Sequence, residues 1–314
     1  TALPAARLTA AEWNFAVGPA SGLFEKLQRM PVKLGQLAER ISQGIRTSAN
    51  EIYVLDVVSE RGGFITARSK QLDKEVVLER RAVSRFLAGR EIKAYSIQPS
   101  GKVVIIPYEL RSGKSVLIPT GELEDHCPKT AAYLRANKKY LEAREDGRMQ
   151  GTGWHGFIYP KNLDVMKSPK LLVPDIADRA AFALDENGEF AFTSGYGITF
   201  KPGVKESPKY LLGLLNSRLL DWFWKRVSTP LRGGFYRYFT QFIEQLPIRP
   251  IDFGVAAELA EHDALVKLVD QILSAKQANP AADTSAWERE IDERVYRLYG
   301  LTPEEIQIVE GAAK

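Results

Sequence analysis

The chain has 314 residues, of which 45% are hydrophobic and 26% are charged, so it can bury one sizeable core or two smaller ones and is not disordered as a whole. It contains no apolar run of about eighteen residues and no N-terminal signal core, so the sequence predicts neither membrane insertion nor secretion. One cysteine, Cys127, excludes an internal disulfide, and we expect a cytoplasmic protein.

The formal net charge of +4 is distributed unevenly along the chain. Residues 251–314 contain thirteen Asp or Glu and six Lys or Arg, a net charge of −7, whereas residues 1–250 contain 26 Asp or Glu and 37 Lys or Arg, a net charge of +11. A basic body beside an acidic end indicates that one part of the chain meets a polyanion and the other does not. Charge alone leaves open the alternative of scatter over a solvated surface.

The first predicted elements are a helical lead-in at residues 10–30 and a strand-like run at 37–44. A short loop and a β-rich run at 52–58 follow. Further strands are predicted where alternating or apolar runs are bounded by Gly, Pro, Asn or Asp, at residues 102–108, 115–118, 157–159, 171–174, 180–184, 189–193 and 196–200. Asn187-Gly188 predicts a hairpin between two of these runs, because Asn-Gly supplies the positive φ angles of tight turns.

Two helices are expected within this β region, at residues 129–144 and 209–225. The first should bury one face made of Tyr133, Leu134, Tyr140 and Leu141, and the second should be largely buried. After Pro250, helices are predicted at 256–276, 287–299 and from Thr302, which has the signature of an N-cap. The fold class is therefore α+β: a curved, mostly antiparallel β region with inserted helices, followed by an α-helical tail.

Sequence motifs for catalysis and metal binding are scarce. There is no Walker-type phosphate loop, no GxGxxG between a strand and a helix, and no GxSxG elbow. His126-Cys127 lacks the second Cys/His pair that a zinc site needs. Glu91-Ile-Lys93 with Asp73 has the form of a Mg²⁺-dependent nuclease site, which is a minor alternative. We therefore predict no catalytic and no metal-ligating residues.

Two basic loops offer groups that contact nucleic acids. The first combines a guanidinium, hydroxyls and an amide with flexible backbone, in Gly44, Arg46, Thr47, Ser48 and Asn50. A simple turn in which Thr47 and Asn50 satisfy local backbone groups is the open alternative. The second loop surrounds a glycine pair with cations and aromatics, in Lys225, Arg232, Gly233, Gly234, Tyr236, Arg237 and Tyr238. Trp222 and Phe223, just before it, are expected in the core.

The order of several segments carries a family resemblance: residues 34–55, 86–95, 170–176, 210–248 and 290–305. The sequence resembles the C-terminal specificity region of type IIG restriction–modification enzymes and related adenine-N6 DNA methyltransferases. The resemblance implies that S-adenosylmethionine and the Asn-Pro-Pro-aromatic motif belong to a catalytic domain absent from this chain, in cis or in trans. Here Asn279-Pro280 is followed by Ala281. The family's loop Gly-Ile-x-Thr-Gly has Ser48 in place of its second glycine.

These observations predict a DNA target-recognition domain at residues 1–250, with a helical lead-in at 1–30. A helical tail at 251–314 would pack on it or on the missing catalytic domain. The expected function is sequence-specific recognition of double-stranded DNA for an adenine-N6 methyltransferase, with no membrane partner and no catalysis by this chain alone. A protein-interaction scaffold that uses the acidic tail is the alternative.

Overall fold

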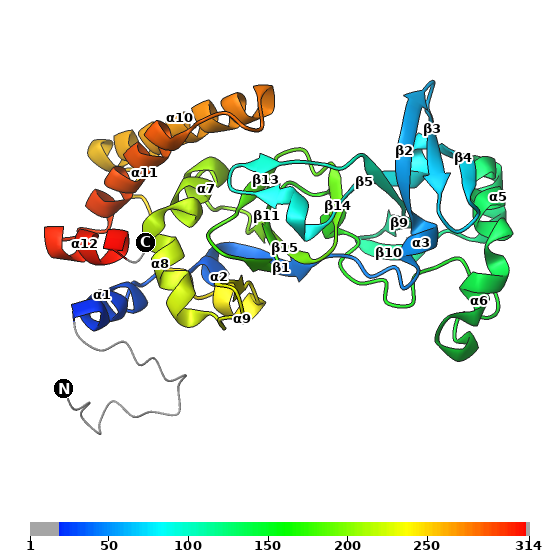
Figure 1. Ribbon diagram of the computed structural model, residues 1–314, viewed down its shortest axis with the longest axis horizontal. Helices are drawn as coiled ribbons and strands as arrows, with labels where there is room; N and C mark the ends of the chain where they lie inside the picture. The colour runs from blue at the N-terminus through cyan, green and yellow to red at the C-terminus, as the bar shows by residue number, and fades with distance from the viewer. Residues whose placement is uncertain (1–18, 312–314) are drawn as a thin grey trace.

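The computed structural model describes residues 19–311, and two mainly antiparallel sheets form its centre (Figure 1). The first has four strands, in the order β1 (Ala38–Gln43), β15 (Gly195–Phe200), β11 (Lys170–Pro174) and β13 (Ala183–Asp185). The second has six, in the order β14 (Phe190–Phe192), β5 (Val83–Leu87), β8 (Lys102–Ile105), β2 (Val54–Arg61), β3 (Phe64–Ser69) and β4 (Lys74–Glu79). Only β14 and β5 pair in parallel within these sheets.

Short elements complete the β region. Three two-stranded ladders pair β6 (Ile92–Lys93) with β7 (Ser96–Ile97), β9 (Tyr108–Arg111) with β10 (Lys114–Leu117), and β12 (Ile176–Ala177) with β16 (Tyr236–Arg237). The short helical turns are α2 (Leu34–Leu37), α3 (Asn50–Tyr53), α9 (Thr240–Ile243), η2 (Arg80–Ala82), η3 (Gly89–Glu91) and η4 (Val165–Lys167).

The longer helices gather at the two ends of an elongated molecule (Figure 1). Beside the six-stranded sheet lie α4 (Thr120–His126), α5 (Pro128–Ala136) and α6 (Lys138–Gly147). At the other end lie α1 (Pro19–Gln28), α7 (Pro208–Asn216), α8 (Arg218–Val227), α10 (Ala256–Ala278), α11 (Ser285–Leu298) and α12 (Pro303–Gly311). Among residues 19–311 we find no helix with the length and apolar character needed to cross a bilayer.

Two hydrophobic cores hold these layers together. The larger core joins the four-stranded sheet, α7 and α8 to the tail, where Leu265 and Val269 of α10 and Val295 of α11 are buried. The smaller core lies between the six-stranded sheet and α4–α6. Because the larger core includes residues on both sides of position 250, the tail helices pack directly on α7 and α8.

The α+β class and most predicted elements are confirmed, including the three tail helices. The predicted lead-in survives as α1, and its first part, residues 10–18, lies outside the described residues. Trp222 and Phe223 are in the core as expected, with 2% and 1% of their surfaces exposed. Tyr140 is 43% exposed, so the predicted buried face of its helix is wrong at that residue.

Both predicted helices within the β region are broken in two. Asn137 separates α5 from α6, and its side-chain amide donates to the Tyr133 carbonyl over 2.9 Å. Ser217 has an extended backbone between α7 and α8, and its hydroxyl donates to the Leu214 carbonyl at 2.6 Å and accepts from the Leu220 amide at 3.4 Å. Each polar side chain replaces backbone hydrogen bonds that a continuous helix would have made.

Three strand predictions need correction. Residues 157–159 form no strand, and Tyr159 makes only an isolated bridge with Arg46. The run that begins at residue 52 starts as the last turn of α3 before β2 begins at Val54. The predicted hairpin at Asn187-Gly188 is wrong, because β13 belongs to the four-stranded sheet and β14 to the six-stranded sheet. Gly188 does have a positive φ of 65°, so the chain turns there but pairs elsewhere.

Candidate nucleic-acid interface

The first predicted loop follows β1 and leads into α3. Arg46, Ser48 and Asn50 are exposed, whereas Thr47 is only 1% exposed. The Thr47 hydroxyl donates to the Asn50 side-chain oxygen at 2.6 Å and accepts from the Ala49 amide at 3.1 Å. The turn alternative therefore holds for Thr47, which shapes the loop and does not face solvent. The exposed groups left for a ligand are Arg46, Ser48 and one face of Asn50.

Gly44 is required by packing inside the protein. A Cβ atom at this position would lie 2.3 Å from the Phe192 carbonyl oxygen and 2.8 Å from Thr193 Cα. The Gly44 amide donates to the Gly195 carbonyl over 3.1 Å, which binds the loop to β15. Ser48, at the position of the family's second glycine, adopts a positive φ of 57°. The backbone there keeps the left-handed conformation that glycine favours.

Gly44→Ala is expected to lower the free energy of unfolding by about 1–3 kcal/mol, because the clash involves backbone that cannot move aside cheaply. Urea denaturation followed by circular dichroism measures this loss. Gly121→Ala, at an exposed glycine of α4 whose added Cβ would meet nothing within 4 Å, is the comparison and should lose no stability. Equal stability of Gly44→Ala and the parent chain would contradict this packing role.

A buried arginine anchors the first loop from beneath. Arg144 is 7% exposed and lies where α6 kinks. Its guanidinium donates to the carbonyls of Thr47 at 3.2 Å, Trp154 at 2.9 Å and Gly156 at 2.8 Å. No local pattern predicts this role, because the acceptors are backbone carbonyls of Thr47, about a hundred residues earlier, and of Trp154 and Gly156, ten and twelve residues later. Arg144 therefore fixes the loop that presents Arg46.

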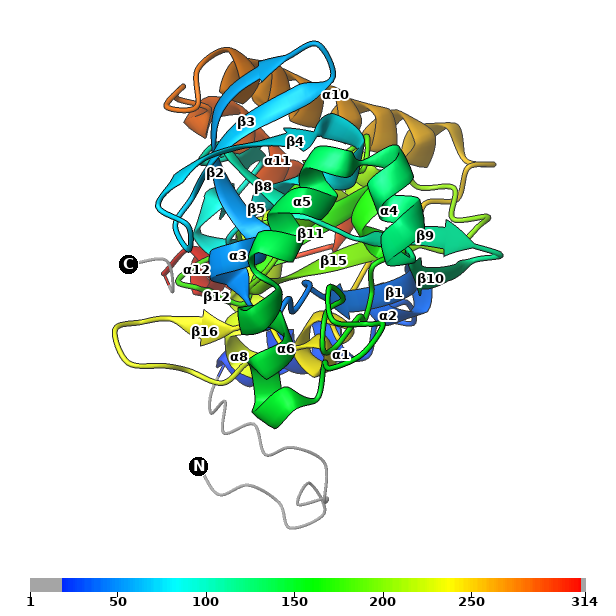
Figure 2. The ribbon, with the colours of Figure 1, turned by 90° about the vertical axis from the view of Figure 1, so that its right-hand side faces the viewer.

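The second predicted loop leaves α8 and returns through β16 to pair with β12. Figure 2 shows it projecting from the body at the left of the view. Gly233 and Gly234 have φ angles of 86° and 80°, and the Leu231 amide donates to the Phe235 carbonyl at 2.6 Å. This tight turn leaves Arg232 exposed at its tip, and Phe235 is 43% exposed. An exposed aromatic beside a cation suits stacking against bases and contact with phosphate.

Two other residues of the second loop are placed differently from the prediction. Tyr238 is fully buried and stacks on Trp224 with ring centroids 3.7 Å apart, so it is a core residue and cannot touch DNA here. Lys225 is half-buried and pairs with Asp221 at 2.8 Å, one turn earlier on α8. Tyr236 is also half-buried, with its ring 5.7 Å from Trp224. The candidates that remain are Arg232, the glycine pair, Tyr236 and Arg237.

The two loops meet at Tyr196, at one end of the four-stranded sheet. Gln43 of β1 pairs in register with Tyr196 of β15, and its amide donates to the Tyr196 hydroxyl at 3.3 Å. Burial raises the pKa of Tyr196; the Gln43 hydrogen bond opposes the rise, Asp175 adds to it, and Arg237 and Arg46 oppose it. Both arginines therefore act electrostatically on one phenol. We call Gln43, Arg46, Asp175, Tyr196 and Arg237 the Tyr196 cluster.

Sequence reasoning missed three members of the Tyr196 cluster: Gln43, Asp175 and Tyr196. Asp175 connects β11 to β12, and its carbonyl accepts from the Tyr238 amide at 2.8 Å. Its Oδ1 atom is buried without a hydrogen-bond partner in the part of the chain that the structure describes. Tyr196 is only 3% exposed and the Asp175 Oδ1 atom is buried, so these two shape the site from beneath. The groups left for a ligand are the exposed Gln43 amide and Arg46 guanidinium and the half-buried Arg237 guanidinium. These groups match the donors and acceptors on base edges and phosphates.

The residues of the nuclease alternative do not form a metal site. Asp73 is exposed in the β3–β4 turn and pairs with Arg68. Glu91 is 5% exposed and accepts from the Ala88 amide at 2.8 Å at the start of η3. Across residues 19–311, no group of three or more His, Cys, Asp or Glu is arranged to hold a metal ion.

Comparison with known proteins identifies the family. The family model of the TaqI-like C-terminal specificity domain matches residues 84–248, more than half of the chain. The chain is similar to three proteins that it covers in part. It is 24% identical over 294 residues to the type II restriction enzyme and methyltransferase RM.Eco57I of Escherichia coli, 88% of this chain and 29% of that protein.

It is 29% identical over 234 residues to the type II methyltransferase M.XhoI of Xanthomonas vasicola, 70% of this chain and 39% of that protein. It is 22% identical over 273 residues to the type II methyltransferase M.BstVI of Geobacillus stearothermophilus, 87% of this chain and 41% of that protein. The chain therefore spans less than half the length of each of these relatives. With its matched region at the centre of the fold, this chain belongs to the family of TaqI-like C-terminal specificity domains.

Proposed function

We propose that this chain recognises a short sequence in double-stranded DNA and thereby holds a restriction–modification DNA methyltransferase in register. The observation that carries the proposal is that two arginine-bearing loops, some 190 residues apart in the sequence, adjoin the same strand end. The Gly44 amide of the first loop donates to the Gly195 carbonyl at 3.1 Å, and the amide of Asp175, whose carbonyl accepts from the Tyr238 amide, donates to the Ser194 carbonyl at 2.9 Å. The family and the methyltransferase names of the relatives support it. So does the net charge of +11 on residues 1–250, because cations supply most of the affinity for a duplex.

Methyl transfer belongs, in this proposal, to a catalytic domain outside this chain, joined to it in cis or supplied in trans. That domain would hold S-adenosylmethionine and transfer the methyl group to the N6 atom of adenine. Whether the assembled enzyme also cleaves DNA, as the name of the Escherichia coli relative says of that protein, is a separate property. The lengths of the relatives support this division, since the chain covers 29–41% of the three described above.

Within the interface we assign different tasks to different residues. Gln43 and Arg46 are exposed at the strand end that carries Tyr196, and Arg237 comes from the second loop, so amide and guanidinium groups are available together as reading of base edges requires. Arg232, Gly233 and Gly234 occupy the exposed turn of the second loop, where close backbone approach and one cation suit contact with phosphate. Ser48 and Asn50 flank Arg46 and add hydrogen-bonding groups to the same edge.

The test is selection from a random pool of duplex DNA by the full chain at two salt concentrations. One short motif should be enriched, and Arg46→Ala should weaken binding to it by about 1–3 kcal/mol, roughly 5- to 150-fold. Arg297→Ala removes an equally exposed arginine from α11 of the tail and should leave affinity within about twofold. Binding without an enriched motif, or equal losses in both variants, would contradict recognition by the Tyr196 cluster.

A further inference from the structure

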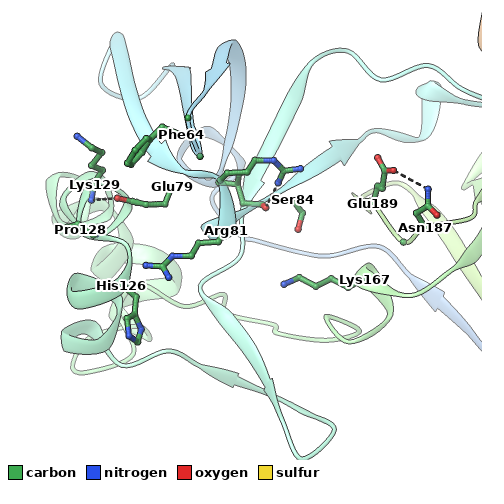
Figure 3. Close-up of a pocket in the computed structure, with 15 residues that line it drawn as sticks. Phe64, Glu79, Arg81, Ser84, His126, Pro128, Lys129, Lys167, Asn187 and Glu189 are labelled. Atoms are coloured by element: carbon green, nitrogen blue, oxygen red, sulfur yellow. Dashed lines mark hydrogen bonds between the residues drawn. The ribbon is translucent and has the colours of Figure 1, made fainter.

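A second basic surface lies away from the Tyr196 cluster, where the β4–β5 connection, the start of α5 and the end of η4 meet around a hollow of about 990 Å³ (Figure 3). Its charged lining comprises four Lys or Arg and two Glu: Arg80, Arg81, Lys129, Lys167, Glu79 and Glu189. The four cations come from three elements, η2, α5 and η4, so this surface is not the solvated face of one helix.

Both acids of the hollow are already engaged inside the protein. The Glu79 carboxylate accepts from the amides of Lys129 and Thr130, each at 2.9 Å, and from the Thr130 hydroxyl at 2.6 Å. Burial alone would raise the pKa of Glu79, but these hydrogen bonds outweigh it and the pKa is lowered. Glu189 lies 3.7 Å from Arg85 and accepts from the Asn187 amide at 3.3 Å. The lining therefore keeps a net charge of +2, from four cations and two acids. Arg80 lies 3.9 Å from Glu60, whereas Arg81, Lys129 and Lys167 form no salt bridge within residues 19–311 and are available to an anion.

Three cationic or N–H-bearing side chains converge on one part of this hollow. Arg81, His126 and Lys167 also line an adjoining recess of about 180 Å³, so the same three residues border both spaces. In Figure 3 the Arg81 guanidinium lies near the His126 ring, and Lys167 extends toward them from η4. A hydrogen bond from Arg81 partly offsets the burial that raises the pKa of the Cys127 thiol, which places the guanidinium beside α4 and α5.

We propose that Arg81, His126 and Lys167 form a phosphate-binding site. A phosphate group presents oxygens in several directions, which suits donors that arrive from η2, from the end of α4 and from η4. The guanidinium fork, the ammonium group and the ring N–H are all established phosphate donors.

The position of the hollow separates it from the recognition loops. Lys167 precedes β11 and Asp175 follows it, so the hollow and the Tyr196 cluster lie toward opposite ends of this strand. A phosphate bound in the hollow is therefore not one of those beside the bases read by the cluster. It comes either from duplex backbone beyond the recognised sequence or from a small phosphate-bearing ligand.

The first measurement is isothermal titration of the full chain with pyrophosphate at low salt. Saturable binding is expected, and Arg81→Ala with Lys167→Ala should weaken it at least about tenfold, because charge-assisted hydrogen bonds are among the strong ones. Arg297→Ala with Lys267→Ala removes the same charge from exposed tail positions and should leave affinity within about twofold. Circular dichroism checks folding, and Lys167→Gln alone should retain the fold with an intermediate loss.

The second measurement compares duplexes of about 12 and about 40 base pairs across a salt series, where each phosphate contact adds about 0.9 to the slope of log affinity against log salt. If the double variant Arg81→Ala with Lys167→Ala lowers this slope by about one for the long duplex and leaves it unchanged for the short one, the bound phosphate belongs to the DNA backbone. Unchanged DNA binding with lost pyrophosphate binding identifies a small ligand. No pyrophosphate binding and no change with either duplex, or equal losses in the tail variant, would overturn the site. Only the comparison of duplexes rests on the proposed function. The phosphate-binding site and the proposed function can therefore fail independently.

Discussion

Replacing Asp185 with alanine is expected to lower the free energy of unfolding by about 3–5 kcal/mol, because it leaves a buried ammonium group without its counter-ion. Lys170 Nζ lies 2.6 Å from Asp185 Oδ2, and the two side chains are only 0% and 2% exposed. Burial lowers the pKa of Lys170, and Asp185 opposes this effect. The remaining partners of the ammonium group are the carbonyls of Met166 at 2.9 Å and Ser168 at 3.1 Å.

Asp185 also shapes the connection between the two sheets. Its carboxylate accepts from the amides of Glu189 at 2.9 Å and Phe190 at 3.1 Å, where the chain passes from β13 to β14. These bonds take the place of the ladder that a hairpin would have formed. Loss of the carboxylate should therefore weaken the junction between the four-stranded and six-stranded sheets as well as the ion pair.

Urea denaturation of Asp185→Ala measures the loss, and the double variant Lys170→Met with Asp185→Asn tests its cause. The double variant removes both charges and keeps an acceptor for one of the two amides, from Glu189 or Phe190, so it should recover part of the stability that the single variant loses. A single variant that unfolds at the same urea concentration as the parent would contradict the role of the pair. Equal losses in the single and double variants would assign the effect to packing.

Helices and turns with local signals could be predicted from the sequence. The start of α12 is an example: the Thr302 hydroxyl accepts from the Glu305 amide at 3.3 Å, and the Thr302 amide donates to the Glu305 carboxylate at 2.9 Å. Both bonds join residues three apart, so the four-residue pattern contains all the information. The Asn187-Gly188 pair likewise predicts the positive φ at Gly188. It does not predict which strand pairs with the residues that follow.

Strands without a clear apolar pattern could not be predicted. The run 64–87 forms β3, β4 and β5, yet no strand was expected there. In β4 only Leu78 and Glu79 are buried, and Glu79 is buried because it accepts hydrogen bonds from the start of α5. From the sequence alone, a glutamate such as Glu79 is expected to face solvent. Its structural role depends on a helix some fifty residues later.

The candidate interface could be predicted only in part, because some of its residues depend on contacts between segments far apart in the sequence. Arg46 and Arg232 stand in exposed, glycine-bearing loops, which composition can indicate. The burial of Thr47 and Tyr238, and the membership of Gln43 and Tyr196, depend on how β1, β15 and β16 are paired with partners far along the chain. Only the folded chain brings these residues together.

The last large effect concerns pH and the attachment of the tail. Asp292 of α11 accepts from the Arg218 amide at 2.8 Å, at the start of α8, and lies 3.2 Å from Arg218 Nε. Burial raises the pKa of Asp292 to about 7 despite the attraction of Arg218, whose side chain is 47% exposed. A raised pKa in the folded chain means that folding favours the protonated carboxyl group. Its stabilising contribution is complete below about pH 4 and is lost as pH rises through 7.

Thermal or urea unfolding between pH 5 and pH 8 should therefore show falling stability in the parent chain, by at most about 3 kcal/mol from this group. Asp292→Asn keeps an acceptor for the Arg218 amide and cannot ionise, so its stability should vary less with pH and should exceed that of the parent at pH 8. Glu290→Gln removes an exposed carboxylate from the same helix and should leave the pH dependence unchanged. Parallel curves for the parent and Asp292→Asn would contradict this account. Since α8 leads into the loop that carries Arg232 and Arg237, DNA affinity measured at the same pH values would show whether the tail contact also positions the interface.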